Sequence, residues 1–397
     1  MKPNVLHIID SFDQGGTESQ AVQLVRLLQE GKLYRVHLAC LNNRGILRDE
    51  AERLDLGGIA EYPLNSFYDL NFLQQLRRCV NHLKEHEIDV VHTHDFYTNI
   101  FGMTAAWLAG VPARIASKRE TEGFRSPMQK RAERYAFALA HSVITNANAV
   151  RNQLAKEGVR AEKLTTVYNS LDINRVAPQL DLQRDAMLAL VNLPPEPRER
   201  RRFVTIVANQ QHAVKDLPTF LHAAARVREA MPQASFVLAG EGELTNELCM
   251  LAKKLGIERD TFFVGHCQRI AELLAVSEVC VLSSKAEGFS NSILEYMAAA
   301  RPVVVTDVGG AREAIIEGET GFIVPAGDHE NMAARIITLL REPERARAMG
   351  HRGRLIVEEK FSCQAQLERT ACLYDLLLAR SAQPVEPALK NLRGRRT

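Results

Sequence analysis

Short apolar runs alternate with amphipathic segments along most of the chain. The run at residues 5–9 is followed by a polar turn and then by apolar positions at helical spacing, and this pattern recurs to about residue 360. Apolar runs without internal alternation are typical of strands buried on both faces by covering helices. The pattern therefore predicts an α/β fold with doubly wound parallel sheets. Further strands are expected at residues 36–40, 90–92, 114–117, 143–146, 165–168, 203–208, 235–239, 261–264, 279–282 and 302–306.

The alternation of strands and helices restarts once, which predicts two domains. Residues 173–202 are polar and irregular, with three prolines beside several arginines, and are interpreted as a linker region. The first domain is then 1–172 and the second 203–362. An amphipathic stretch at 364–380 predicts a terminal helix. Residues 381–397 combine prolines with a basic end and are predicted to be disordered.

Composition narrows the class of protein. The 397 residues are long for one domain, and 46% hydrophobic with 25% charged residues is a soluble, globular balance. A formal net charge of +2 does not indicate nucleic acid as a partner. We see no signal-peptide pattern and no apolar run long enough for a membrane span. The seven cysteines are scattered without a C-x-x-C pair, which favours reduced thiols of a cytoplasmic protein.

Residues 283–300, SSKAEGFSNSILEYMAAA, lead from a predicted strand through a polar turn into a helix. In an open α/β sheet this is where phosphates usually bind. Glu287 and Glu295 would be about 12 Å apart if both were helical, so a loop position for Glu287 is favoured. Two such carboxylates could accept hydrogen bonds from the hydroxyls of a nucleotide sugar. The alternative is that Glu295 only complements the helix dipole and Glu287 is solvated.

Other polar residues follow other strands at the same predicted edge. Gly15 and Gly16 precede a helix, where backbone N–H groups could approach an anion, although such turns also occur without a ligand. Lys215 and Gly265 follow strands of the second half. A cation at Lys215 and a helix N-terminus near Ser290 could hold a diphosphate without a metal.

Histidines end one strand of the first half. His92 and His94 form an H-x-H pattern, but two histidines are too few ligands for a zinc site. We prefer a hydrogen bond from His94 to a substrate, with a structural role as the alternative. Basic residues between Lys118 and Arg134 are either a solvated helix face or a surface for an anionic lipid or a phosphate-bearing acceptor. The second reading predicts peripheral contact with the inner face of a membrane.

These segments together resemble the retaining glycosyltransferases of family 4, also called glycosyl transferases group 1. The strongest likeness is E-x7-E within EGFSNSILE, followed at the right distance by RPVVVTDVGG. The Gly15-Gly16 turn, His94, residues 169–172 and Lys215 extend it over nearly the whole chain. The resemblance implies a GT-B fold, two Rossmann-like domains facing each other across a cleft, with the helix at 364–380 packing back on the first domain.

The family implies a role for each matching position. The Gly16 backbone would contact a donor phosphate, and His94 would lie near the reacting sugar. Lys215 would neutralise the diphosphate, Glu287 would hold sugar hydroxyls, and Glu295 would bind the ribose. No metal and no cofactor are expected. The predicted catalytic residues are His94, Lys215 and Glu287, and the predicted donor-binding residues are Gly15, Gly16, Asn209, Lys215, Gly265, Phe289, Ser290, Asn291, Ser292 and Glu295.

The chain departs from the family pattern at two positions. Asn209 stands where the family has an arginine, a second cation on the diphosphate. Its loss would weaken leaving-group stabilisation by about 2–4 kcal/mol unless another residue, such as Arg119, replaces it. Ser170 stands in place of a glycine, which is a milder change.

The predicted function is retaining transfer of a sugar from a nucleoside-diphosphate donor to a hydroxyl of a saccharide or lipid-linked acceptor, in synthesis of a cell-surface polysaccharide or glycolipid. A nucleotide-sugar epimerase of the same fold and a non-catalytic nucleotide-sugar-binding protein are the alternatives. A dehydrogenase is disfavoured because neither first turn carries G-x-G-x-x-G.

Overall fold

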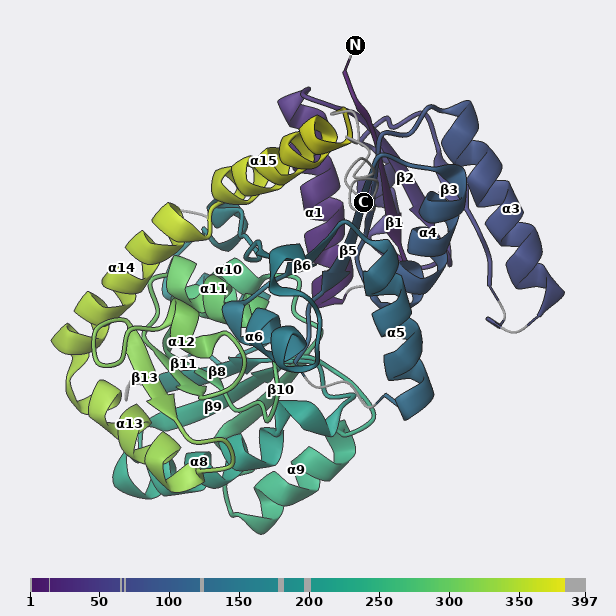
Figure 1. The fold of residues 1–397 in the computed structure, drawn as a ribbon. Helices are drawn as coiled ribbons and strands as arrows, with labels where there is room; N and C mark the ends of the chain where they lie inside the picture. The colour runs from purple at the N-terminus through teal and green to yellow at the C-terminus, as the bar shows by residue number, and fades with distance from the viewer. Residues whose placement is uncertain are drawn as a thin grey trace, which may run out of the picture. The chain divides into compact units, whose positions relative to one another are not determined.

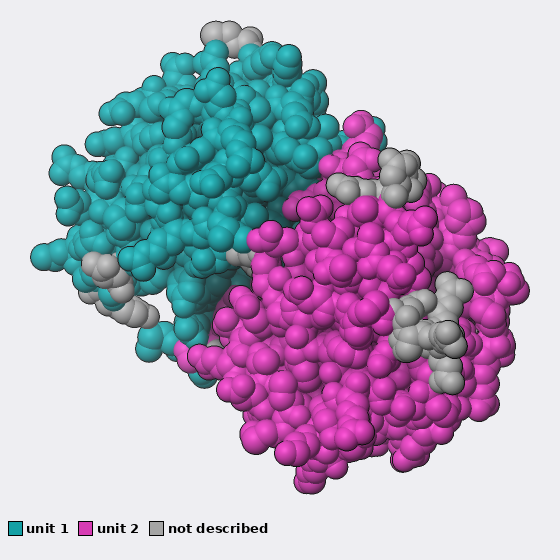
Figure 2. Space-filling view, turned by 180° about the vertical axis from the view of Figure 1, so that it is seen from behind, with its two compact units in different colours: residues 1–117, 127–143, 367–397 teal, residues 118–126, 144–366 magenta. Residues whose placement is uncertain are grey.

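A computed structural model describes residues 2–13, 15–64, 66–67, 69–121, 125–177, 182–195 and 201–382. The chain divides into two compact units, coloured teal and magenta in Figure 2. Unit 1 comprises Met1–Ser117, Pro127–Val143 and Leu367–Thr397, and unit 2 comprises Lys118–Ser126 and Ile144–Gln366. Each predicted strand is present, with bounds that differ from the expected ones by at most two residues.

The first sheet has seven strands in the order β3-β2-β1-β4-β5-β6-β7, and its strands from β3 to β5 pair in parallel (Figure 1). Its β1 strand is buried on both faces, as an apolar run predicts. One polar residue, His7, lies in the middle of that run and is also buried. The elements are β1 (Asn4–Ile9), α1 (Gly16–Gly31), β2 (Arg35–Cys40), α2 (Arg48–Glu52), β3 (Ile59–Glu61), α3 (Leu70–Glu85), β4 (Val90–Thr93), α4 (Phe96–Ala109), β5 (Ala113–Lys118), α5 (Pro127–Leu139), β6 (Ser142–Thr145) and β7 (Leu164–Thr166).

The second sheet has six parallel strands in the order β10-β9-β8-β11-β12-β13. Apolar residues of β8, β9 and β11 pack with α8 and α13 in one large core cluster. The elements are α6 (Asn148–Lys156), η1 (Ala161–Lys163), η2 (Ile173–Val176), α7 (Arg184–Leu190), β8 (Arg202–Val207), η3 (Ala213–Lys215), α8 (Leu217–Ala230), β9 (Ala234–Ala239), α9 (Thr245–Lys254), β10 (Thr261–Gly265), α10 (Ile270–Val276), β11 (Ser277–Leu282), α11 (Asn291–Ala298), β12 (Val303–Thr306), α12 (Ala311–Ala314), β13 (Gly321–Val324), α13 (His329–Arg341) and α14 (Pro343–Lys360).

Residues 144–172, which the sequence assigned to the first domain, group with unit 2. Ala147 and Leu171 share a core cluster with Phe289 and Ile293, so apolar contacts hold this segment there. The predicted linker also contains η2 and α7, and Leu188 of α7 is buried in a cluster of unit 2. Residues 178–181 and 196–200 of that linker lie outside the described residues.

A terminal helix, α15 (Cys363–Ala382), begins in unit 2 and groups with unit 1 from Leu367 onward. Figure 1 shows α15 in yellow beside α1, and Leu367 lies next to Gly31. The Tyr34 hydroxyl donates to Asp375 Oδ1 at 2.8 Å. Residues 381 and 382, predicted as part of a disordered tail, continue the helix, and 383–397 lie outside the described residues. Within the described ranges, no helix combines the length and apolarity needed to cross a membrane.

Candidate functional site

Lys215 and Glu287 meet at the carboxyl edge of the second sheet. Lys215 ends η3 after β8, and Glu287 lies in the loop after β11, the strand next to β8. The Lys215 Nζ is 2.7 Å from Glu287 Oε1, which also accepts from Ser284 Oγ at 2.7 Å. The two charged side chains are only 23% and 13% exposed, so water screens this ion pair less than a surface pair. The loop position predicted for Glu287 is confirmed, because α11 begins at Asn291.

The N-terminus of α11 is tied to the end of β8. The Ser292 hydroxyl donates to the carbonyl of Val207 at 3.0 Å, and the Tyr296 hydroxyl accepts from the N–H of the same residue at 2.7 Å. Ser290 is the N-cap and makes no capping hydrogen bond through its side chain to the described residues. The positive end of a helix dipole therefore lies at this sheet edge, where it favours a bound anion.

Arg119 lies one side chain away from this helix N-terminus. Its Nη1 donates to Asn169 Oδ1 at 2.8 Å, and Asn169 Nδ2 donates to Asn291 Oδ1 at 2.8 Å and to the Phe289 carbonyl at 3.1 Å. A Cβ on Gly288 would lie 1.9 Å from the Arg119 carbonyl oxygen, so the two backbones touch and only glycine fits. The structure thus brings a cation to the Glu287 loop from a segment far away in the sequence.

Asn209 and Gly265 both lie where strands of the second sheet end. Asn209 is exposed just after β8, so a neutral side chain stands where the family pattern has a cation. Its neighbour Gln210 is buried, and Gln210 Nε2 donates to the Gly240 carbonyl at 2.7 Å. Gly265 ends β10 with φ +66°, a conformation that favours glycine.

Glu295 lies in α11 and is half-buried. Burial raises the pKa of its carboxyl from 4.5 to about 7, while the charge of Arg175 in η2 opposes this shift. A partly buried carboxyl with so high a pKa is costly for the unliganded protein, and such groups cluster at functional sites. The position suits a group that gains hydrogen-bond donors when a ligand arrives.

The Glu295→Gln variant is expected to be more stable than the native protein at pH 8 and equally stable below pH 4.5. Below pH 4.5, the Glu295 carboxyl of the native sequence is protonated in both the folded and the unfolded state. Between 4.5 and about 7 only the unfolded state ionises, so native stability falls as pH rises. The gain at pH 8 should be about 1–2 kcal/mol, because the group is only partly shielded from water. Urea unfolding at several pH values measures it, with Glu330→Gln on the exposed face of α13 as control; an equal effect of both changes would contradict the prediction.

In unit 1, several carboxylates lie near the turn before α1, where they oppose the binding of an anion. Gly15 is the N-cap of α1 in an extended conformation, and a Cβ there would lie 2.0 Å from Glu18 Oε2. Burial and the charges of Asp10 and Glu18 raise the pKa of Asp95, which follows β4, to about 7. Burial and Asp13 raise the pKa of Asp10. A phosphate at the Gly16 amide would have to overcome these carboxylates, which sequence reasoning had not placed there.

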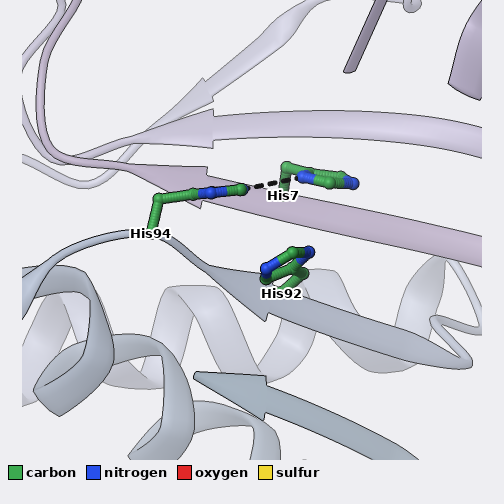
Figure 3. Close-up of side chains that lie close together, drawn as sticks. All are labelled: His7, His92 and His94. Atoms are coloured by element: carbon green, nitrogen blue, oxygen red, sulfur yellow. Dashed lines mark hydrogen bonds between the residues drawn. The ribbon is translucent and has the colours of Figure 1, made fainter. Parts of the chain in front are cut away.

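His94 is buried beside two other histidines, and the three rings appear together in Figure 3. His94 Nε2 lies 2.9 Å from His7 Nδ1, and His7 pairs in register with His92 on the neighbouring strand. One nitrogen from each ring lies within 4.8 Å of the others, so this group could be considered for a metal ion. Sequence reasoning counted two histidines and missed His7, although a polar residue inside an apolar strand run was the available signal.

The three imidazoles fit a hydrogen-bonded cluster better than a metal centre. The rings of His94 and His7 are nearly parallel at 16°, and those of His94 and His92 are inclined by 28°. Imidazole lone pairs lie in the ring plane, so stacked rings do not direct their nitrogens to one point. Both nitrogens of His92 already lie within hydrogen-bond distance of Tyr374 and Ser117.

Sequence models of two families match the chain. Residues 14–175 match Glycosyltransferase Family 4, and residues 194–355 match Glycosyl transferases group 1. The chain belongs to the glycosyltransferases of family 4, or group 1. A putative glycosyltransferase of Bacillus subtilis, EpsD, is 29% identical over 324 residues, covering 77% of this chain and 80% of EpsD. An Escherichia coli alpha-1,3-galactosyltransferase acting on a diphosphoundecaprenol-linked sugar is 26% identical over 64% of this chain and 67% of its own.

Solved structures show which fold the chain has. Anabaena HepE in complex with UDP superposes with a TM-score of 0.81 and 20% identity, covering 94% of this chain and all of that one. Sucrose-phosphate synthase from Thermosynechococcus elongatus superposes with a TM-score of 0.76 and 20% identity, over 95% and 100% of the two chains. The glycosyltransferase therefore has the GT-B fold. As a family member it is a transferase that moves a sugar from a nucleotide sugar to an acceptor.

Proposed function

We propose that this glycosyltransferase transfers a sugar from a uridine-diphosphate donor, with retention of anomeric configuration and without a metal ion. The observation that carries the proposal is the Lys215–Glu287 ion pair beside the N-terminus of α11. A cation and a helix dipole at one sheet edge supply the positive charge that a departing diphosphate needs. UDP as the leaving group is supported by the structures of HepE, which were solved in complex with UDP and with UDP-glucose.

The proposed roles follow from what each group can do chemically. Lys215 neutralises the leaving diphosphate, and Glu287 exchanges part of its contact with Lys215 for sugar hydroxyls. Glu295 accepts hydrogen bonds from the ribose, which offsets the cost of its buried carboxylate. Because Glu287 Oε1 already holds two donors, Lys215 and Ser284, we assign it to binding and not to nucleophilic attack. Retention then requires the acceptor to attack on the face that the diphosphate leaves.

The proposed acceptor is a hydroxyl of a saccharide or of a lipid-linked sugar, in synthesis of a cell-surface polysaccharide or glycolipid. The diphosphoundecaprenol-linked substrate named for the Escherichia coli relative supports the lipid-linked form. We place the reaction in the cytoplasm, at the inner face of the membrane.

One surface of α5 supports peripheral contact with a membrane. Lys130, Arg131 and Arg134 are exposed there, together with Met128 and Tyr135, which are 66% and 54% exposed. Basic and apolar groups on one helix are suited to an anionic lipid surface. Lys118, in contrast, is buried and lies near Glu120. Flotation with anionic vesicles tests this contact, and no binding at low salt would contradict it.

The function is tested with the full chain and a panel of UDP-, GDP-, ADP- and TDP-sugars, each with saccharide and undecaprenyl-diphosphate-linked acceptors. We expect transfer from a UDP-sugar that persists in EDTA, and NMR of the anomeric proton should show the configuration of the donor in the product. The variant with both Glu287→Ala and Glu295→Ala should be inactive. Conversion of donor alone would indicate an epimerase, and binding without transfer to any acceptor a non-catalytic protein; inversion or a metal requirement would contradict the mechanism.

A further inference from the structure

A short segment between two elements of unit 1 packs on the Glu287 loop. Residues 118–126 run from the end of β5 to the residue before α5, yet they group with unit 2. Within this segment the Thr121 hydroxyl donates to the backbone carbonyl of Glu287 at 2.7 Å. In the described ranges of the chain, this is the one hydrogen bond that the Glu287 carbonyl accepts. The contact therefore holds the backbone of the residue whose side chain pairs with Lys215.

The next peptide of the loop is held by a different segment. The Gly288 carbonyl accepts from the N–H of Gly310 at 2.7 Å. A Cβ on Gly309 would lie 2.2 Å from the Glu287 carbonyl oxygen and 2.5 Å from the Gly288 carbonyl oxygen, so the two backbones are in contact. Gly309 also has a φ of +52°, a conformation that favours glycine. Two consecutive carbonyls of the loop are thus bonded, one by Thr121 and one by the loop after β12.

The segment that carries Thr121 is itself anchored. Asn146, which follows β6 and is 2% exposed, donates from Nδ2 to the Arg119 carbonyl at 3.1 Å. The same carbonyl oxygen is the atom that a Cβ on Gly288 would meet at 1.9 Å. A hydroxyl on an anchored backbone loses little conformational freedom when it forms a hydrogen bond. The Thr121 hydroxyl is therefore already in place to hold the Glu287 loop.

The position of the Glu287 backbone decides where its carboxylate lies. Glu287 Oε1 accepts from Lys215 Nζ and from Ser284 Oγ, both at 2.7 Å. Hydrogen bonds weaken steeply as their angle departs from linearity, so a rotation of the Glu287 peptide would disturb both of these contacts. Bonds from the carboxylate to the hydroxyls of a sugar would be disturbed for the same reason.

We propose that Thr121 is a positioning residue for Glu287. Its hydroxyl fixes the Glu287 backbone carbonyl and thereby keeps the carboxylate directed at the transferred sugar. The effect on sugar transfer rests on the proposed function, in which Glu287 binds sugar hydroxyls, whereas the hold of Thr121 on the loop does not. Because Glu287 is assigned to the sugar and not to the nucleotide, Thr121 should affect turnover and leave the binding of a nucleoside diphosphate unchanged.

Three variants separate the hydroxyl from the rest of the side chain. Thr121→Val removes the hydroxyl and keeps the shape of the side chain, whereas Thr121→Ser keeps the hydroxyl. Thr338 of α13 provides the matched control, since it is half-buried like Thr121 and its hydroxyl donates to the Ala334 carbonyl at 3.0 Å. Thr338→Val makes the same chemical change in a different element. Thermal unfolding shows whether each variant is folded.

Hydrogen–deuterium exchange of the full chain without a donor tests the hold on the loop. The Gly310 N–H donates to the Gly288 carbonyl, and the Lys285 N–H donates to the Val214 carbonyl at 2.8 Å, so these two amides report on the loop from both sides of Glu287. We expect both to exchange about twofold to tenfold faster in Thr121→Val. Thr121→Ser and Thr338→Val should exchange like the native protein. Native exchange at both amides in Thr121→Val would overturn the proposal.

Kinetics with the donor that the native enzyme accepts test the effect on the reaction. Thr121→Val should lower kcat about tenfold, and Thr121→Ser should restore most of the loss. The Kd of the nucleoside diphosphate of that donor, measured by calorimetry, should stay within about twofold of the native value, and Thr338→Val should have native kcat. An unchanged kcat in Thr121→Val, or an equal loss of nucleoside-diphosphate binding, would overturn the positioning role.

The two tests distinguish this inference from the proposed function. A donor other than a UDP-sugar would overturn the proposed function and leave the role of Thr121 intact. If the native protein transfers no sugar, the proposed function fails, and the exchange of the Gly310 and Lys285 amides alone decides whether Thr121 holds the Glu287 loop.

Discussion

Replacing Lys215 with methionine is expected to lower kcat about 100-fold to 1,000-fold with a smaller change in KM. The ammonium group meets a charge that grows as the diphosphate leaves, so its contribution is larger in the transition state than in the bound substrate. In the unliganded protein this group is held 2.7 Å from Glu287 Oε1, already oriented at the sheet edge. Steady-state kinetics with the accepted donor measure the effect.

Lys285 supplies the control for this experiment. It lies in the same loop as Glu287, its side chain is 61% exposed, and its Nζ lies 3.2 Å from Asp216 Oδ1. Lys285→Met should leave kcat within about twofold of the native value. Thermal unfolding of both variants shows whether they fold. A Lys215→Met enzyme that is folded and retains native kcat would contradict the leaving-group role.

Replacing Arg119 with alanine is expected to lower kcat about 10-fold to 100-fold. The reason is that Arg119 is inferred to supply the second cation on the diphosphate, which the family has at the position of Asn209. Its Nη1 is 2.8 Å from Asn169 Oδ1, which links it to the first residue of α11. The loss should be smaller than for Lys215, since this guanidinium reaches the helix N-terminus through an intervening amide. Kinetics with a fixed acceptor measure it.

A second substitution makes the Arg119 prediction specific. Adding Asn209→Arg to Arg119→Ala should recover most of the lost kcat, because the new cation would occupy the position that the family pattern uses. Arg125→Ala is the matched control: Arg125 belongs to the same segment and pairs with Glu120. If Arg125→Ala lowers kcat as much as Arg119→Ala, or if Asn209→Arg restores nothing, the assignment of Arg119 is wrong.

The segment at 283–300 shows how far sequence reasoning reaches. Its apolar run, turn and helical spacing predicted a strand, a loop and a helix, and the structure has β11, the Glu287 loop and α11 in that order. The separation of two glutamates along a helix axis predicted a loop position for Glu287, which is confirmed. These inferences succeed because burial on one face or both leaves a local period in the sequence.

Contacts between distant segments were beyond that kind of reasoning. Arg119 reaches the Glu287 loop through Asn169, and Tyr374 contacts His7 across 367 positions of the chain. Local periodicity indicates that a residue is buried, but it carries no information about which strand lies beside it. The domain boundary also depends on contacts between distant segments. Residues 144–172 continue the alternation of strands and helices of the first domain, yet they pack with the core of unit 2.

The sequence by itself determined the α/β class, all strands of the described residues except β3 and β13, and the loop and helix that carry Glu287 and Glu295. These features depend on the period of apolar residues and on spacing along one element. Only the tertiary structure decided that His7 joins His94, that Arg119 approaches α11, and that α15 brings Tyr374 into the histidine cluster. The physical reason is that strand order and helix packing choose neighbours through the total burial of the chain, to which every segment contributes.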